Sequence, residues 1–304
     1  MPNGPTVVVV VNPTAGRGKA GKLVGRADRI LHELAVDHVI RISESAEDLE
    51  RKARAAAVEG AVVVAVLGGD GSVSAAVNGL LGTEAALAVF PGGTGDDFAK
   101  TIGAGHFNSA VRLTADPKIR QIDVVRLTMG TVLRHFVNVA GAGFDSEVNQ
   151  TANDMKVNLG GTGTYVAAVL KTLSRFTPAH YEIGIDDLKL SLDAMLTVIG
   201  SGISYGGGMK VLPTASLNDG VLDVCIVEAL SKAAFLRAFP RVFNGSHTKH
   251  PKIQMHRGRR ITLEADRRMQ IHADGEQIGP LPAVFEVVPA ALPVVVGPDA
   301  KGIR

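Results

Sequence analysis

The first third of the chain alternates between short apolar runs and longer stretches in which apolar residues recur at helical spacing. Residues 6–11 form an uninterrupted β-branched run, which is typical of a strand covered on both faces in a parallel sheet. Further strands are predicted at residues 36–42, 61–67 and 85–90.

Helices are predicted between these strands. Apolar side chains that follow the first strand fall on one helical face. Ser45 and Asp48 match a capping box that opens a second helix, and a third is predicted over residues 72–81. This alternation predicts a doubly wound α/β domain with a parallel sheet over residues 1–125. Ligands of such sheets bind beyond the carboxyl ends of the strands.

The second half of the chain is dominated by strand-like runs. They lie at residues 122–128, 132–139, 181–185, 194–199, 221–227, 261–264, 269–272 and 283–288. Helical patterns interrupt them only at about residues 164–176 and 231–243. We therefore expect a β-rich, sandwich-like domain over residues 126–304, whose last residues are candidates for packing back onto the first domain. No low-complexity linker separates the halves, so an active site is expected in the cleft between them.

Composition narrows the class of protein. The chain has 304 residues, of which 46% are hydrophobic, and a net charge of +2, which is too small to indicate a nucleic-acid partner. The single cysteine, Cys225, rules out an intrachain disulfide and is expected to be a buried apolar residue. No signal peptide is visible, and the apolar runs are too short to span a membrane. A cytoplasmic protein is therefore expected.

Two glycine-rich segments follow the third and fourth strands. They are Gly68-Gly69-Asp70-Gly71-Ser72 and Pro91-Gly92-Gly93-Thr94-Gly95. Loops without bulky side chains let backbone N–H groups approach a ligand, and the N-terminus of the next helix favours a phosphate. On the loops alone, an ordinary strand-to-helix turn remains an alternative.

The first strand is followed by two incomplete motifs. Residues 16–21 fit G-x-G-x-x-G, with Glu44 near the end of the next strand, so a dinucleotide-binding oxidoreductase is an alternative. Pro13 and Thr14, however, separate the strand from the first glycine, whereas that motif requires a tight turn. A Walker A loop fails because Leu23 lacks the hydroxyl for Mg²⁺. This segment also carries four basic residues, Arg17, Lys19, Lys22 and Arg26. They either face an anionic ligand or a membrane surface, or form a solvated helix face.

Taken together, the two glycine loops resemble the nucleotide-binding signature of the diacylglycerol kinase and sphingosine kinase family of lipid kinases. The second loop continues as Asp96-Asp97-Phe98-Ala99. Further matching segments are Asn12-Pro13, Gly143-Phe144-Asp145, Tyr205-Gly206-Gly207-Gly208-Met209, Asn218-Asp219-Gly220 and Asp274-Gly275-Glu276. The resemblance extends from about residue 7 to about residue 297.

The resemblance implies ATP and Mg²⁺ as cofactors. The residues that it assigns to the nucleotide are Asn12, Ser43, Gly68, Gly69, Asp70, Gly71, Ser72, Gly93, Thr94 and Asp97. The metal site that it implies combines Asp219 with the backbone carbonyls of Ser216 and Val221, a donor set that suits a hard cation. Glu276 is implied as the general base for a lipid hydroxyl, with Asp274 as a metal or network partner. Without the resemblance, Asp274-Gly275 predicts only a hairpin turn.

The chain departs from the family pattern at two places. Ser74-Ala75 stands where the family usually has an Asn-Glu pair, and Asp96 stands where the second loop usually has Asn. A carboxylate at residue 96 is unfavourable beside phosphates unless Mg²⁺ or a basic residue such as Lys100 offsets its charge.

The expected activity is transfer of the γ-phosphate of ATP to a lipid hydroxyl, with diacylglycerol as the first candidate. Residues 249–268 carry seven Lys or Arg, which either help the protein to reach an anionic membrane or form a solvated face. A cytoplasmic enzyme bound peripherally to the membrane during turnover is expected, and a homodimer is left open. The alternatives are a soluble-metabolite kinase of the NAD kinase type and a non-catalytic nucleotide- or lipid-binding module.

Overall fold

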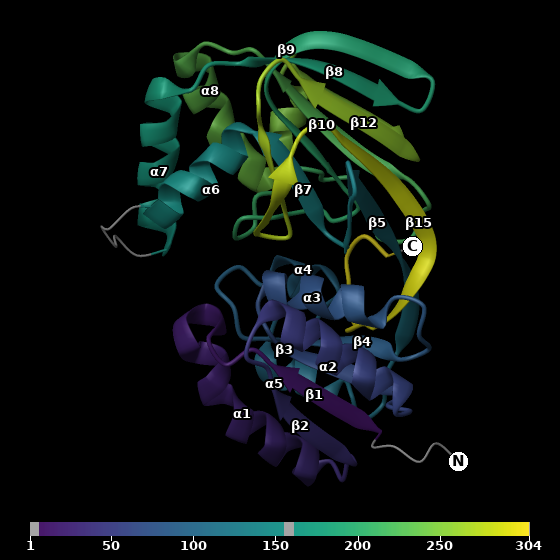
Figure 1. Ribbon diagram of the computed structural model, residues 1–304. Coiled ribbons are helices and arrows are strands. Elements are labelled where there is room, and N and C mark those ends of the chain that lie inside the picture. The colour runs from purple at the N-terminus through teal and green to yellow at the C-terminus, as the bar shows by residue number, and fades with distance from the viewer. Residues whose placement is uncertain (1–5, 155–160, 304) are drawn as a thin grey trace.

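The computed structural model describes residues 6–154 and 161–303 and shows two lobes joined along one side (Figure 1). The N-terminal lobe is α/β, and the C-terminal lobe is built mainly of strands with helices on one side. Within the described ranges, no helix is long and apolar enough to cross a membrane.

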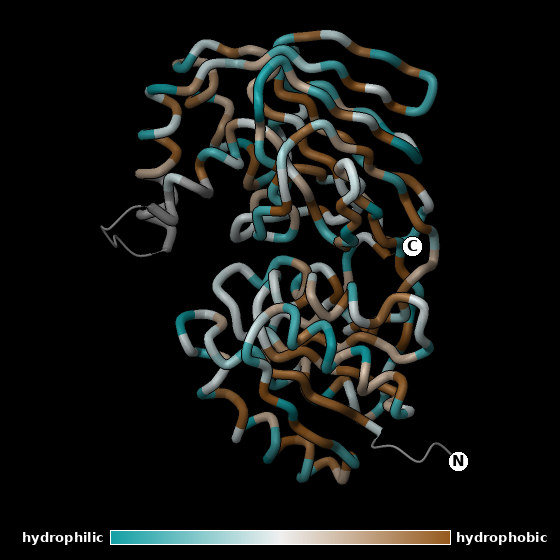
Figure 2. Tube along the Cα trace, viewed as in Figure 1, coloured by the Kyte–Doolittle hydropathy of each residue, from teal (hydrophilic) through white to brown (hydrophobic). Residues whose placement is uncertain are grey.

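A parallel sheet forms the centre of the N-terminal lobe. Its strands are β1 (Val7–Val11), β2 (His38–Ile42), β3 (Val63–Gly68) and β4 (Ala86–Pro91), in the order β2-β1-β3-β4. Every residue of β1, β3 and β4 is buried, and Figure 2 shows the hydrophobic residues along β1. This burial on both faces explains why these strands are almost uniformly apolar.

Helices cover both faces of this sheet. One face carries α1 (Ala15–Glu33) and α5 (Phe107–Arg112), and the other carries α2 (Ala46–Val58) and α3 (Asp70–Leu80). The short helix α4 (Asp97–Thr101) follows the second glycine loop. The doubly wound α/β architecture predicted from the sequence is therefore confirmed.

The C-terminal lobe contains the remaining elements. Its strands are β6 (Val132–Phe136), β7 (Val139–Gly143), β8 (Ala179–Ile185), β9 (Leu188–Gly200), β10 (Leu222–Glu228), β11 (Ile253–Gly258), β12 (Arg260–Ala265), β13 (Gln270–Ala273) and β14 (Glu276–Pro280). Its helices are α6 (Phe144–Asp154), α7 (Gly161–Arg175), α8 (Lys232–Ala238), η1 (Phe239–Asn244) and η2 (Ser246–Lys249). All strand pairs within this lobe are antiparallel, and the predicted β-rich character is confirmed.

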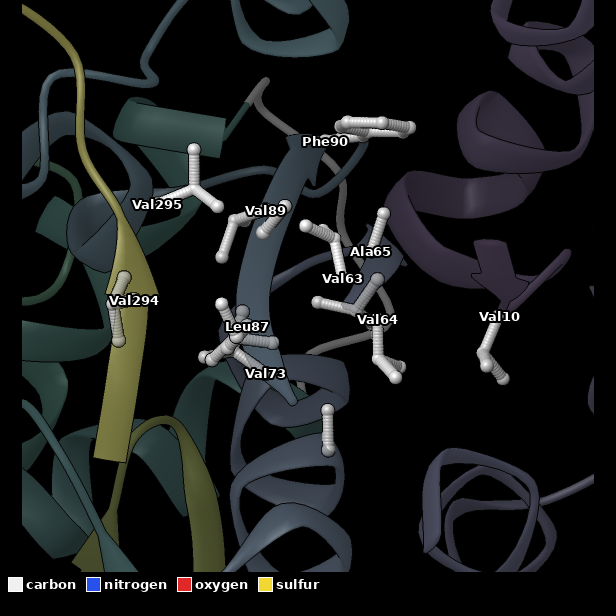
Figure 3. Close-up of a cluster of buried hydrophobic side chains, with 14 of the residues drawn as sticks. Val10, Val63, Val64, Ala65, Val73, Leu87, Val89, Phe90, Val294 and Val295 are labelled. Atoms are coloured by element: carbon white, nitrogen blue, oxygen red, sulfur yellow. The ribbon is translucent and has the colours of Figure 1, made fainter. Parts of the chain in front are cut away.

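Two long strands join the lobes. β5 (Ile119–Met129) and β15 (Ala283–Val295) pair antiparallel, with a register shift between Val288 and Leu292. The far end of β15 pairs with β4, where Val294 and Val295 lie beside Leu87 and Val89 (Figure 3). After β15 the chain stays on the N-terminal lobe, where Lys301 N–H donates to the Thr101 carbonyl at 2.7 Å. The predicted domain boundary between residues 125 and 126 falls inside β5 and stays a prediction.

Some elements differ from the predicted ones. The run at residues 132–139 divides into β6 and β7, because the backbone N–H groups of residues 137–139 donate to a side chain instead of a neighbouring strand. The helix predicted at residues 231–243 ends as an α-helix at Ala238 and continues as a 3₁₀ helix from Phe239, next to Pro240. β11 and β14 are half-exposed and gave no clear apolar pattern.

Candidate active site

The two glycine loops pack directly against each other at the carboxyl ends of β3 and β4. A Cβ atom added to Gly93 would lie 2.5 Å from the Gly69 Cα, and one added to Gly16 would lie 2.2 Å from the Gly92 carbonyl oxygen. Only glycine therefore allows this approach of three backbone segments. They border an open cavity of ≈ 230 Å³, whose lining includes the predicted site residues Asn12, Gly69, Gly71, Ser72, Gly93, Thr94 and Glu276.

Asn12 fixes the entrance of this cavity. Its Nδ2 donates to Ser72 Oγ at 3.0 Å, which ties the turn after β1 to the first turn of α3. Ser43 lies behind the cavity, since its buried hydroxyl donates to the Val11 carbonyl at 2.8 Å. The structure therefore brings Asn12 and Ser72 together and does not bring Ser43 to the cavity lining.

Asp70 and Asp97 hold backbone amides. Asp70 accepts hydrogen bonds from the N–H groups of Asp97 and Phe98 at 3.3 and 3.2 Å, so it links the first loop to α4. Burial, with the nearby Asp97 carboxylate, raises the pKa of Asp70 to about 6. Asp97 Oδ2 accepts from the Gly207 N–H at 2.7 Å, which connects the second loop to the C-terminal lobe. Among the described residues, Asp97 Oδ1 is buried and has no hydrogen-bond partner.

Asp96 adopts a left-handed backbone conformation with a φ of 51°. Its Oδ1 accepts a hydrogen bond from the Gly93 N–H at 2.9 Å. The side-chain oxygen of an asparagine at this position could accept the same hydrogen bond. The positive charges of Lys19 and Lys100 lower the pKa of the Asp96 carboxyl, although burial raises it by more. Lys100 therefore lies close enough to offset part of the negative charge of Asp96, as expected from the sequence.

Asp274 is the anchor of the turn between β13 and β14. Its carboxylate accepts three backbone N–H groups, from Val137, Asn138 and Val139, at 3.1, 3.2 and 3.0 Å. Both oxygens are therefore engaged by the chain, and burial raises the pKa of Asp274 to about 7. Of the two roles expected for Asp274, the geometry matches the network partner.

This turn carries Glu276 across the cleft to the first glycine loop. A Cβ atom added to Gly71 would lie 2.5 Å from Glu276 Oε1, so the carboxylate rests directly over the Gly71 backbone. Desolvation and the charge of Glu47 raise the pKa of Glu276, whereas the charge of Arg134 lowers it. Glu276 and Gly71 of the first glycine loop, 205 positions apart in sequence, thus share one cavity.

A second cavity, of ≈ 250 Å³, continues from Glu276 between α2, α3 and β6. We call it the Arg134 groove; it is lined by Glu47, Glu50, Ser74, Ala75, Asn78, Arg134, His135, Gln277 and others. Asn78 holds its two sides together, because its Nδ2 donates to the His135 carbonyl at 2.8 Å and its Oδ1 accepts the His135 N–H at 3.1 Å. This groove was not predicted from the sequence. Ser74 and Ala75, at which the chain departs from the family pattern, form part of its wall.

The segment Asn218-Asp219-Gly220 lies at the junction of β5 and β15. Asp219 forms an ion pair with Arg257, whose Nε lies 3.5 Å from Asp223 Oδ2. Gly220 N–H donates to Asp123 Oδ2 at 2.7 Å, and Asp123 Oδ1 accepts from Ala290 N–H at 2.9 Å in the register shift of β15. Asp123, a buried residue that the sequence analysis did not select, therefore ties this segment to both strands.

The predicted metal site fits Mg²⁺ in its donor chemistry. Within the described ranges, no group of three or more His, Cys, Asp or Glu side chains is placed to hold a metal ion. A site here would therefore depend on one carboxylate with backbone oxygens, as the pattern of Asp219, Ser216 and Val221 requires. The guanidinium of Arg257 already pairs with the Asp219 carboxylate. A cation would therefore share this carboxylate with the guanidinium or displace the guanidinium from it.

An apolar cavity of ≈ 70 Å³ lies inside the C-terminal lobe, between β9, β10, α8 and η1. Its lining is mainly apolar, and its polar side chains are those of Asp145, Tyr205 and His247. Tyr205 Oη donates to Asp145 Oδ2 at 3.4 Å, and burial raises the pKa of Asp145 to about 6. The same glycine segment that carries Tyr205 binds Asp97 through Gly207, so it connects the apolar cavity to the phosphate loops.

The carboxylate of Glu276, from the β-rich lobe, lies over a glycine loop of the α/β lobe, an arrangement that suits a two-lobed kinase. The diacylglycerol kinase catalytic domain matches residues 6–127, and the YegS C-terminal NAD kinase beta sandwich-like domain matches residues 138–296. The chain is 34% identical over 293 residues to the diacylglycerol kinase of Mycobacterium tuberculosis, which covers 95% of this chain and 94% of that protein. It therefore belongs to the diacylglycerol kinase family of lipid kinases.

Other relatives agree with this family. The diacylglycerol kinase of Bacillus subtilis is 28% identical over 282 residues, covering 91% of each protein. The crystal structure of a diacylglycerol kinase from Bacillus anthracis str. Sterne has a TM-score of 0.74 at 20% identity and covers 98% of this chain and 99% of that one. This likeness shows that the fold is shared.

Proposed function

We propose that the protein is an ATP- and Mg²⁺-dependent lipid kinase that transfers the γ-phosphate to a lipid hydroxyl, with diacylglycerol as the first candidate acceptor. The observation that carries the proposal is the position of Glu276 over Gly71, where a carboxylate from one lobe meets the side-chain-free loop of the other. The names of the curated relatives support the choice of acceptor.

The phosphate loops bind and orient the nucleotide. Gly69 and Gly71 line the cavity and would offer backbone N–H groups to the phosphates, and the hydroxyls of Ser72 and Thr94 would add donors. Phosphoryl transfer depends chiefly on such positioning and on charge stabilisation. Mg²⁺, when bound, neutralises part of the phosphate charge, and Asp219 with the carbonyls of Ser216 and Val221 would hold a cation at the junction of the lobes.

Glu276 serves as the general base. The acceptor hydroxyl oxygen forms a bond to the γ-phosphorus while the bond between that phosphorus and the β,γ-bridging oxygen breaks and ADP leaves. The hydroxyl proton passes to the Glu276 carboxylate, which must therefore be ionised beforehand. Asp274, fixed by three backbone N–H groups, holds the turn so that Glu276 faces the loop.

The apolar cavity is the proposed site for an acyl chain. Its mainly apolar lining suits a hydrocarbon tail, and the hydrogen-bonded pair of Asp145 and Tyr205 suits the hydroxyl or ester groups of the lipid. A soluble metabolite would leave this cavity without a role, and this observation favours a lipid acceptor.

The direct test offers the protein labelled ATP, Mg²⁺ and a panel of acceptors: diacylglycerol, a sphingoid base and phosphatidylglycerol in detergent micelles, and NAD in solution. Label is expected in the lipid fraction, with diacylglycerol preferred. Label in NAD alone would instead assign the chain to soluble-metabolite kinases, and nucleotide binding without ADP release would make it a binding module.

Asp219→Ala is expected to abolish the stabilisation of the folded protein by Mg²⁺. Binding of Mg²⁺ to the folded state raises the melting temperature of the wild-type protein by mass action. In Asp219→Ala this rise should disappear, whereas Asp116→Ala, at an exposed aspartate, should retain it. Thermal unfolding with and without MgCl₂, in the absence of nucleotide, makes the comparison. An equal rise in Asp219→Ala would remove Asp219 from the metal site.

Arg134→Gln is expected to move the acid limb of the kcat–pH profile to higher pH. The base acts as a carboxylate, so activity falls as pH drops through its pKa. Arg134 lowers the pKa of Glu276, and its loss therefore raises that pKa. Glu47 and Glu50 from α2 and His135 from β6 also line the groove and remain in place.

Ala75→Glu provides an independent version of this pH test. It adds a carboxylate to the Arg134 groove, where it competes with Glu276 for the guanidinium, so the acid limb should again move upward. Arg134→Lys and Ala75→Gln are the matched controls, since the first keeps the positive charge and the second adds volume without charge. An acid limb unmoved in both Arg134→Gln and Ala75→Glu would contradict the role of Arg134.

A further inference from the structure

The outer wall of the apolar cavity carries a ladder of aromatic rings that reaches the protein surface. Phe144, which lines the cavity, packs against Phe235 with ring centroids 4.7 Å apart. Phe235 stacks on Phe239 at 6.0 Å, and Phe239 meets Phe243 at 6.1 Å. Exposure rises along α8 and η1, from 6% at Phe235 to 48% at Phe243. A continuous apolar path therefore connects the cavity with solvent.

The opposite side of α8 and η1 is exposed and basic. Lys232, Arg237 and Arg241 are exposed there, as is Leu236, whose side chain is 41% exposed. Residues 229–252 contain five Lys or Arg and no Asp or Glu, although the whole chain is nearly neutral. Among the residues that the structure describes, Lys232, Arg237, Arg241 and Lys249 form no ion pair with a carboxylate. We call this face, with Phe243 at its edge, the α8–η1 face.

Basic side chains beside exposed apolar ones are typical of segments that lie in a membrane interface. Such a segment places apolar residues at the boundary of the acyl chains while Lys and Arg contact headgroup phosphates. An acidic protein would satisfy the charges of the α8–η1 face but would give no role to a path of aromatic rings that leads into a cavity suited to hydrocarbon. An anionic lipid bilayer satisfies both features.

We propose that the α8–η1 face docks on an anionic membrane and that an acyl chain enters the cavity along Phe243, Phe239 and Phe235. Arg237 and Arg241 contact the headgroups, and Leu236 and Phe243 enter the outer part of the acyl region. This inference rests on the proposed lipid kinase function, because it supplies the route by which a membrane lipid reaches the site.

Vesicle binding without ATP tests the docking separately from catalysis. Sedimentation with phosphatidylcholine vesicles, alone or mixed with phosphatidylglycerol, should show binding that requires the anionic lipid and weakens with salt. Arg237→Gln/Arg241→Gln should bind anionic vesicles about 25-fold more weakly, or about fivefold for each charge removed. Arg29→Gln/Lys189→Gln removes two exposed charges from other elements and should bind as the wild type does. Equal losses in the two double variants would overturn the proposal.

The apolar contribution has its own variant. Phe243→Ser should weaken vesicle binding at high salt as well as at low salt, because the lost contact is not electrostatic. Circular dichroism melting verifies that each variant is folded. Wild-type binding by both Phe243→Ser and Arg237→Gln/Arg241→Gln would overturn the proposal. A loss of dimer in these variants with vesicle binding unchanged would assign the face to a second copy and overturn it as well.

Turnover measurements distinguish the proposed membrane docking from the lipid kinase function on which it rests. In Arg237→Gln/Arg241→Gln, the ratio of turnover on vesicle diacylglycerol to turnover on a dispersed short-chain diacylglycerol should fall with vesicle binding. An unchanged ratio would contradict docking while leaving the kinase function intact. Vesicle binding by a wild-type protein that phosphorylates no lipid would instead reject the kinase function.

Discussion

Glu276→Gln is expected to lower kcat by a factor of about 10²–10⁴, the usual contribution of a general base. The amide keeps the size of the side chain and its place over Gly71, but it cannot accept the hydroxyl proton. Nucleotide affinity should change little, because the phosphate loops bind through backbone N–H groups and the hydroxyls of Ser72 and Thr94. Steady-state kinetics with a lipid acceptor and a nucleotide-binding titration give the two quantities.

Glu47→Gln is the matched control for this variant. Glu47 lies in the same groove as Glu276 and acts on the pKa of Glu276 through its charge. It does not line the cavity formed by the glycine loops, so kcat at neutral pH should remain near the wild-type value. Similar losses in the two variants would mean that total charge in the groove, and not proton transfer by Glu276, controls turnover.

Gly71→Ala is expected to lower kcat by about 10²-fold, because displacing a catalytic group by about 1 Å has effects of this size. The new methyl group would lie 2.5 Å from Glu276 Oε1 and would push the carboxylate away from the loop. The protein should still fold, since the clash is with the end of a flexible side chain. Gly25→Ala, on α1 with open space around the added Cβ, is the control and should retain activity.

A double-mutant cycle decides whether Gly71 acts through Glu276. In a Glu276→Gln background the methyl group has no base to displace, so Gly71→Ala should cause little further loss of kcat. Losses that multiply fully would show that Gly71→Ala damages phosphate binding independently of Glu276. The comparison uses kcat at saturating ATP, together with the KM for ATP in all four proteins.

The sequence predicted most of the N-terminal lobe because its signals are local. Strands such as β1 and β3 are buried on both faces and are therefore apolar at every position. The gap between β6 and β7 was not predictable, because it depends on Asp274, whose carboxylate takes the N–H groups of residues 137–139 from a distant part of the chain. β14 was missed because its half-exposed residues carry no apolar alternation.

Part of the candidate site was also predictable from the sequence, and part of it was not. The glycine loops could be located because close backbone approach requires glycine at fixed positions after a strand. The engagement of Asp97 by Gly207, 110 positions away, could not be inferred from spacing, nor could the burial of Ser43 behind the cavity. Arg134 and Asn78 were not selected, because each takes its place from tertiary packing. Asp145 belongs to the matching segment Gly143-Phe144-Asp145, but its place beside the apolar cavity also depends on tertiary packing.

The sharing of β5 and β15 by both lobes has a mechanical consequence. β15 pairs with β4 at one end and with β5 and β12 in the rest of its length, and Asp123 accepts a hydrogen bond from Ala290 N–H where the register of β15 shifts. Opening the cleft therefore bends a continuous sheet, whereas a flexible linker would allow free rotation. A stiff connection of this kind keeps Glu276 and Gly71 aligned before any substrate binds. The conformational entropy of bringing the base to the phosphate site is therefore lost once, during folding, and not at each turnover.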